Sequence, residues 1–120
     1  MLARADATPT LVFDEVDAGI GGRAADRVGR SLWRLARSHQ VICVTHLPQI
    51  AAYADAHLRI AKAARDGRTV TEIEALDGEA RRRELAAMLG GEESIGDAAL
   101  AAARDLLERA DGLRGEAATA

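Results

Sequence analysis

The chain has 120 residues, 48% of them hydrophobic and 29% charged, which suits one small globular domain or a segment of a larger one. The net charge of −3 excludes a protein that binds nucleic acid through its overall charge, and the single cysteine excludes an internal disulfide. With only three aromatic residues, the core must consist mainly of Ala, Leu, Val and Ile. Such a core is modest for a lone domain, which first indicates a fragment.

Targeting and membrane segments are absent from the sequence pattern. Residues 1–10 contain no apolar run of signal-peptide length, and no stretch approaches 18 apolar residues. We therefore expect a cytoplasmic protein, associated with the nucleoid when it acts on DNA, and no contact with a membrane.

The first half of the chain predicts a strand, a helix and a second strand. Residues 10–13 form a continuous apolar run, typical of a parallel strand that is covered on both faces. Residues 23–38 follow a helical period, with one apolar face and one arginine-rich face. Residues 41–45 are a second buried apolar run. Short connections between them indicate a right-handed βαβ unit.

A short helix and a hairpin are predicted next. Pro48 favours the first turn of a helix that runs from about residue 47 to residue 55. Alternating segments at 57–63 and 68–76 are joined through Asp66-Gly67, a strong signal for a two-residue hairpin turn.

Two helices complete the predicted α/β fold. One covers residues 79–89 and is stopped by Gly90-Gly91. Ser94 and Asp97 resemble a capping box for a last helix that ends near Ala110. We expect residues 112–120 to form a flexible tail, because they are small and polar.

The strongest chemical signal is the acid pair Asp14-Glu15 after the first apolar strand. Ligands of open α/β sheets bind at the carboxyl ends of parallel strands. Phosphoryl transfer needs one group that anchors Mg²⁺ and another that orients the attacking water. The alternative is a solvated strand end with two chance acids.

His46 stands at the end of the second predicted strand, after Thr45. Adjacent strands lie about 5 Å apart, so His46 is expected beside Asp14 and Glu15. It could then hydrogen-bond a γ-phosphate or the attacking water. A lone histidine is more often structural, but this one follows the strand next to the acid pair.

Three motifs resemble an ABC-type P-loop ATPase. Residues 10–15 resemble a Walker B strand, residues 17–22 a D-loop, and residues 44–46 the loop of a switch histidine. The amino-acid sequence of these motifs is similar to the RecN family of bacterial DNA repair proteins, which are relatives of the structural-maintenance-of-chromosomes (SMC) proteins. The similarity covers about residues 8–110, including the blocks at 14–22, 44–55, 57, 76–79 and 88–91.

The resemblance implies a role for each matching residue, with ATP and Mg²⁺ as cofactors. It implies that Asp14 supports the metal, that Glu15 is the catalytic base and that His46 senses the γ-phosphate. Asp17 would belong to a loop that crosses to a second head in an ATP-sandwiched dimer, and Gln49 is carried over as a nucleotide contact. DNA would be contacted through the full-length protein, not clearly through this chain.

The sequence departs from the family pattern in the phosphate-binding half. A Walker A loop needs Gly-Lys-Ser/Thr, and the only lysine, Lys62, follows Ala61. The glycine pairs at 21–22 and 90–91 are not preceded by serine, so the Ser-Gly-Gly signature is absent. Residues 1–111 are therefore interpreted as the C-terminal half of an ATPase head, which we expect to be inactive by itself.

Two alternatives remain open. The chain could belong to another SMC-like or a helicase-type ATPase, although a helicase does not explain Thr45-His46 one strand after the acids. It could also be a truncated, non-catalytic fragment that only binds another head. The arginines of residues 23–37, and Arg81, Arg82 and Arg83, are interpreted as solvated helix faces.

Overall fold

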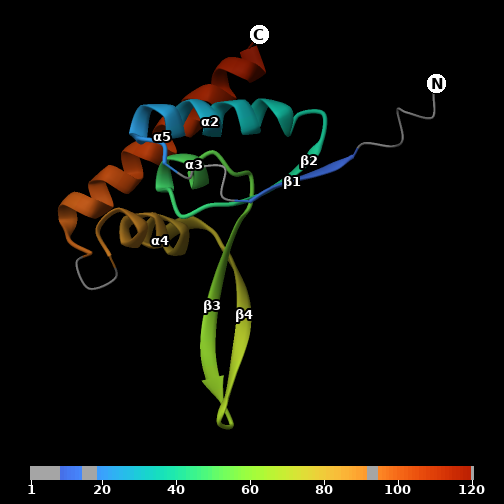
Figure 1. The fold of residues 1–120 in the computed structure, drawn as a ribbon. Coiled ribbons are helices and arrows are strands. Elements are labelled where there is room, and N and C mark those ends of the chain that lie inside the picture. Colours follow the sequence, from blue (N-terminus) through green and yellow to red (C-terminus); the bar gives the residue numbers. More distant parts are fainter. Residues whose placement is uncertain (1–8, 15–18, 92–94, 120) are drawn as a thin grey trace.

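The computed structural model describes residues 9–14, 19–91 and 95–119, and it confirms the predicted α/β fold. Figure 1 shows a group of helices with a short pair of strands beside them and a long hairpin that projects away. No helix among the described residues is long and apolar enough to cross a membrane. In chain order the elements are β1 (Thr10–Asp14), α2 (Gly22–Leu35), β2 (Gln40–Val44), α3 (Pro48–Ala51), β3 (His57–Arg65), β4 (Arg68–Leu76), α4 (Gly78–Gly90) and α5 (Asp97–Thr119).

The first three elements form the predicted βαβ unit. Strands β1 and β2 pair in parallel, with Thr10 opposite Gln40 and Asp14 opposite Val44. Helix α2 connects them and ends at Leu35, three residues before its predicted end. The carboxyl ends of both strands therefore meet at one edge, where Asp14 ends β1.

The two parallel strands are covered on one face only, so the prediction of strands buried on both faces is wrong. Val12 is 65% exposed, Ile42 47% and Val44 46%. The register puts these three side chains on one face, and the alternate residues of both strands are half-buried. This sheet has only two strands within the described residues, so too little of the chain is available to cover a second face.

The hairpin of β3 and β4 has the predicted two-residue turn. Arg65 pairs with Arg68, and between them Asp66 has a φ of 50° and Gly67 a φ of 75°. Both residues are thus left-handed, as a turn of the type I′ kind requires. Strand β3 continues two residues beyond its predicted end and pairs with β4 throughout.

The core lies among the helices rather than against the sheet. One cluster joins α3, α4 and α5 through small side chains around the fully buried Leu85. The other joins α2 and α5 through Trp33, Ala110 and Leu113, together with Tyr53 after α3. Alanine, leucine and isoleucine are buried as predicted, but the buried residues among those described include no valine and do include two of the three aromatics, Trp33 and Tyr53.

Helix α3 is shorter than predicted: it ends at Ala51, whereas the predicted end was near Asp55. The last carbonyls of this segment are bound by arginine side chains from distant elements. Arg81 of α4 donates to the carbonyl oxygens of Ala51, Ala52 and Ala54, at 3.2, 3.2 and 2.7 Å. Arg81 is therefore partly buried and holds this turn, which corrects the interpretation of Arg81 as part of a solvated face.

Helix α5 is longer than predicted. It begins at Asp97 and continues through Gly112 to Thr119, so the predicted helix end near Ala110 is wrong. The buried side chain of Leu113 packs in the cluster with Trp33, and this packing stabilises the additional helical turns. Ser94, the proposed cap, lies outside the described residues. The division of the chain at residue 111 stays a prediction.

Candidate functional site

The carboxyl edge of the parallel sheet brings two predicted site residues to neighbouring strand ends. Asp14 is exposed on β1 opposite Val44, and Thr45 and His46 follow directly. The Thr45 hydroxyl accepts a hydrogen bond from the backbone N–H of Leu47 at 3.0 Å, which closes the turn that carries the exposed His46. Glu15 and Asp17, the predicted base and D-loop acid, lie outside the described residues.

The donor set at this edge is compatible with a magnesium ion. Within the described part of the chain, no three His, Cys, Asp or Glu side chains gather as a preformed metal cage. Mg²⁺ does not need such a cage, since it is usually held by one or two carboxylates and by substrate phosphates while it keeps several waters. An exposed carboxylate such as that of Asp14 suits this mode of binding.

Gln49 belongs to one of the matching motifs, although its spacing alone gives it no physical role. It is the second residue of α3 and lines a pocket with residues of α2 and α5. Its Oε1 is buried and has no hydrogen-bond partner among the described residues. Whether Gln49 contacts nucleotide stays a prediction.

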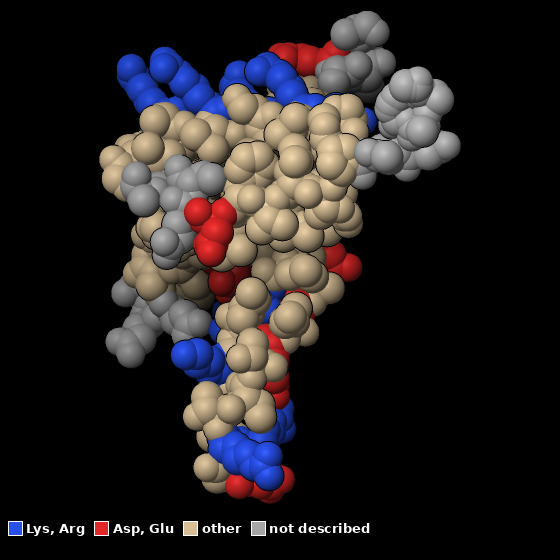
Figure 2. All heavy atoms as spheres, turned by 45° about the vertical axis from the view of Figure 1, so that its right-hand side comes forward, with Lys and Arg blue, Asp and Glu red and all other residues tan. Residues whose placement is uncertain are grey.

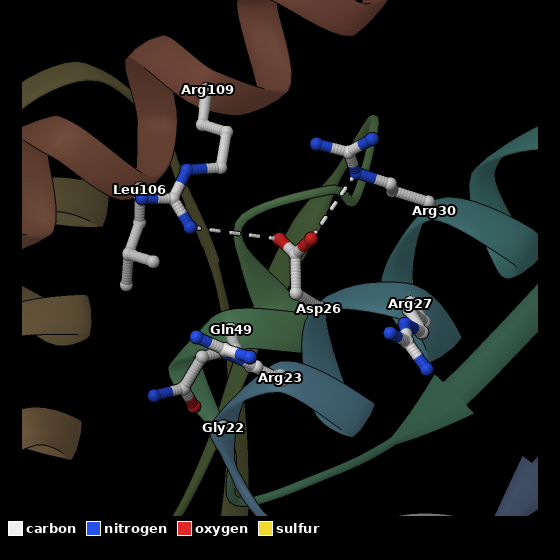
Figure 3. A pocket seen from close by; sticks show the side chains of 8 residues that line it. All are labelled: Gly22, Arg23, Asp26, Arg27, Arg30, Gln49, Leu106 and Arg109. Atoms are coloured by element: carbon white, nitrogen blue, oxygen red, sulfur yellow. Dashed lines mark ion pairs between the residues drawn. The ribbon is translucent and has the colours of Figure 1, made fainter.

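This pocket has a volume of about 680 Å³ and an arginine-rich lining (Figure 3). Asp26 lies at its centre, with ion pairs of 3.2 Å to Arg30 and 3.9 Å to Arg109. The lining residues are Gly22, Arg23, Asp26, Arg27, Arg30, Gln49, Leu106 and Arg109.

Asp26 also connects the pocket to the buried Tyr53. The Tyr53 hydroxyl donates to Asp26 Oδ1 at 2.6 Å and accepts from Arg30 Nε at 3.3 Å. Burial is the main cause that raises the pKa of Tyr53, and the hydrogen bond to Asp26 is the second cause. The phenol therefore stays protonated as a donor. The hydrogen bond that Arg30 donates to Tyr53, followed by the charge of Asp26, helps raise the pKa of Arg30.

A second group of contacts supports the segment that follows His46. Arg114 of α5 donates to the carbonyl oxygens of Tyr53 and Ala54, at 3.1 and 3.0 Å, next to those held by Arg81. Burial lowers the pKa of Arg81, and the nearby Arg114 lowers it further. His57, at the start of β3, has its pKa lowered by burial and by Arg81.

Sequence reasoning missed these arginine contacts because their partners are distant in the chain. Arg81 lies 27 to 30 residues from the carbonyls that it binds, and Arg114 lies about 60 residues away. No local pattern marks such a contact. For the separate contacts of the α2 pocket, a weak signal is Asp26, the one acid of a helix that carries four arginines.

Comparisons with known proteins agree with the motifs. No protein-family model matches the chain. It is 54% identical over 110 residues to the DNA repair protein RecN of Mycobacterium leprae, and 51% over 110 residues to RecN of Streptomyces coelicolor. RecN of Xylella fastidiosa is 53% identical over 103 residues. These matches cover 86–92% of this chain, which spans only 18–19% of the length of these relatives.

One solved structure shares the fold. It comes from work on ATP-driven dimerization and DNA-stimulated activation of SMC ATPases. The TM-score is 0.51 at 27% sequence identity, and the match covers 61% of this chain and 43% of that one. The chain therefore has the fold of part of an SMC-type ATPase head.

Proposed function

We propose, from the place of this chain among the RecN DNA repair proteins, that it supplies the hydrolytic half of an ATPase head. The observation that carries the proposal is the meeting of Asp14 and the Thr45-His46 turn at one edge of a parallel sheet. Strand ends of this kind are where open α/β sheets act on ligands. The high identity to RecN over most of the chain supports the same assignment.

Each polar residue at this edge has a separate role in the proposal. Asp14 faces the cation that accompanies the nucleotide, and Mg²⁺, when bound, neutralises charge on the phosphates. Glu15 orients the attacking water and accepts its proton. His46, exposed on its turn, hydrogen-bonds the γ-phosphate or that water. Asp17 and Gln49 are assigned to the nucleotide contacts of the assembled head.

The phosphate-cradling half must come from outside these 120 residues, since the sequence contains no Walker A loop. The open face of the sheet suits an attachment of that kind. Val12, Ile42 and Val44 are exposed there, and Asp14 lies on the same face at its carboxyl end. Polypeptide that covers this apolar face would be brought directly beside Asp14.

A second head and DNA complete the proposed assembly. The SMC structure that shares this fold is described in terms of ATP-driven dimerization and DNA-stimulated activation. By analogy, nucleotide would close two heads of the complete protein, and hydrolysis would open them. The isolated 120-residue chain is expected neither to hydrolyse ATP nor to bind it tightly, because the phosphate loop supplies most triphosphate contacts.

The test separates Asp14, Glu15 and His46 by single-turnover hydrolysis and nucleotide affinity in the complete protein that carries this segment. Glu15→Gln should slow hydrolysis by roughly 10²–10⁴-fold and still allow ATP binding and head closure, because only the base is removed. Asp14→Asn should weaken Mg²⁺-dependent binding of ATP. His46→Ala should slow turnover more than it weakens binding.

Matched control variants lie on the hairpin, away from this edge. Glu74→Gln and Asp66→Asn make the same chemical changes on β4 and in the turn, and both should leave hydrolysis near the parental rate. Near-parental hydrolysis by Glu15→Gln would show that Glu15 is not the base. If Asp14→Asn also left binding unchanged, the proposed site would be wrong.

A further inference from the structure

The pocket between α2 and α5 concentrates positive charge in a chain that is acidic overall. The described residues of its lining include four arginines and one acid, a net charge of +3, whereas the whole chain carries −3. Three of these arginines come from α2, and the fourth, Arg109, comes from α5. Folding therefore gathers cations that are far apart in the sequence around one hollow.

The acid in the pocket is already engaged. Asp26 contacts Arg30 and Arg109 and accepts the hydrogen bond of Tyr53. Arg23 and Arg27 are exposed and make no ion pair with any described residue. Within the part of the chain that the structure describes, no carboxylate neutralises these two guanidinium groups, so they can bind an anion.

Exposed arginine continues along the same helix beyond the pocket. Arg34 is exposed and also has no ion pair with a described residue. Between Arg23 and Arg34, helix α2 rises about 16 Å, at 1.5 Å per residue. Figure 2 shows arginine side chains (blue) along the upper edge of the molecule, where α2 lies, since the only lysine, Lys62, is on β3. A single phosphate cannot occupy a row of this length, whereas several phosphates of one nucleic-acid strand can.

The chemistry of the lining favours backbone contact over base contact. Guanidinium groups bind phosphate oxygens in a bidentate geometry, and arginines make up half of the described lining. Among the described residues, no aromatic side chain lines the pocket, and the nearby Trp33 and Tyr53 are buried. This lining thus offers bases no ring to stack on, unlike a typical single-strand binding site.

We propose that Arg23, Arg27 and Arg34, with Arg109 across the pocket, form a contact surface for the phosphate backbone of duplex DNA. This surface belongs to the chain itself and lies outside the proposed ATPase edge. It binds without sequence preference, because phosphates position a protein but do not specify bases. The solvated arginine face expected from the sequence thereby becomes one wall of a binding pocket.

The test measures binding of a fluorescein-labelled DNA duplex to the complete protein that carries this segment, without nucleotide, by fluorescence anisotropy over a range of KCl concentrations. R23Q/R27Q should weaken binding about tenfold or more. The slope of log K against log[KCl] should become less steep by about 2, one for each lost phosphate contact. The matched control R68Q/R83Q removes two exposed arginines from the hairpin and α4, and should change affinity less than about twofold.

A local readout excludes an indirect effect of the substitutions. Arg27→Cys, labelled with a thiol-linked photo-crosslinker, should crosslink to the duplex, whereas Arg68→Cys and the parent protein should not. Unchanged affinity in R23Q/R27Q would overturn the proposal, and so would weakened binding without a crosslink at residue 27. Protection of residue 27 by micromolar inorganic pyrophosphate would also overturn it, since the pocket would then hold a free phosphate anion.

These measurements use no ATP. A result that contradicts the DNA-binding proposal therefore leaves the ATPase proposal untouched.

Discussion

At the residue scale, single arginines of this chain act in different ways according to their partners. Arg81 binds three carbonyl oxygens at the end of α3, Arg37 stacks 4.2 Å over the ring of Trp33, and Arg23 faces solvent. These contacts of Arg81 hold the segment that follows the His46 turn, which belongs to the edge that we propose as an ATPase site. All three acceptors share the two N–H groups of Arg81 Nη2, so at least one of these hydrogen bonds is bifurcated.

Arg81→Ala should destabilise the protein by about 2–3 kcal/mol, because carbonyl groups that are partly buried lose a charged donor. Urea unfolding of the complete protein measures the change. Arg83→Ala, an exposed neighbour on the same helix, is the control and should stay within about 0.5 kcal/mol of the parent. Equal effects of the two substitutions would contradict the structural role of Arg81.

At the element scale, close contact between α2 and α3 depends on a glycine. Gly29 is buried in α2, and a Cβ added there would lie 2.5 Å from Cδ2 of Tyr53 and 3.2 Å from the carbonyl oxygen of Gln49. The absence of a side chain lets Tyr53 reach Asp26, and so helps to shape the arginine pocket. Glycine normally weakens a helix interior, and here packing outweighs that cost.

Gly29→Ala should destabilise the protein by about 1–3 kcal/mol, since Tyr53 must move and its hydrogen bond to Asp26 is strained. Gly112→Ala is the matched substitution in α5, where an added Cβ meets nothing within 4 Å. It should stabilise the protein by up to about 1 kcal/mol. Thermal unfolding of both variants gives the comparison, and stabilisation by Gly29→Ala would disprove the packing argument.

At the scale of the whole molecule, the chain exposes two apolar faces on its strands. One is the face of β1 and β2 that carries Val12, Ile42 and Val44. The other belongs to the hairpin, where Ile60 and Ile73 pair directly and are 61% and 66% exposed. Exposed apolar patches with unpaired strand edges favour association.

The 120-residue chain should therefore associate with increasing concentration in sedimentation experiments. Val12→Thr combined with Ile42→Thr should weaken association about tenfold, because it replaces exposed apolar surface by hydroxyl groups and keeps β-branched side chains that suit a strand. Leu89→Thr, an exposed position on α4, is the control and should have little effect. A chain that stays monomeric at all concentrations would show that these faces do not need a partner.

The sequence by itself determined those features that depend on neighbouring residues. Asp66-Gly67 specifies a two-residue turn because both positions accept a positive φ, and Gly91, with a φ of 86°, ends α4 for the same reason. Alternation and apolar runs then identified the strands. The juxtaposition of Asp14 and His46 followed from the rule that parallel strands end at one edge.

Only the tertiary structure decided the features that join distant residues. The bonds of Arg81 to the end of α3, the burial of Leu113 against Trp33 and the position of Arg109 in the α2 pocket have no local signature. The length of α5 and the shortness of α3 follow from such contacts. Burial of the strands was mispredicted for a related reason: covering both faces of a sheet needs elements that the described part of this chain does not supply.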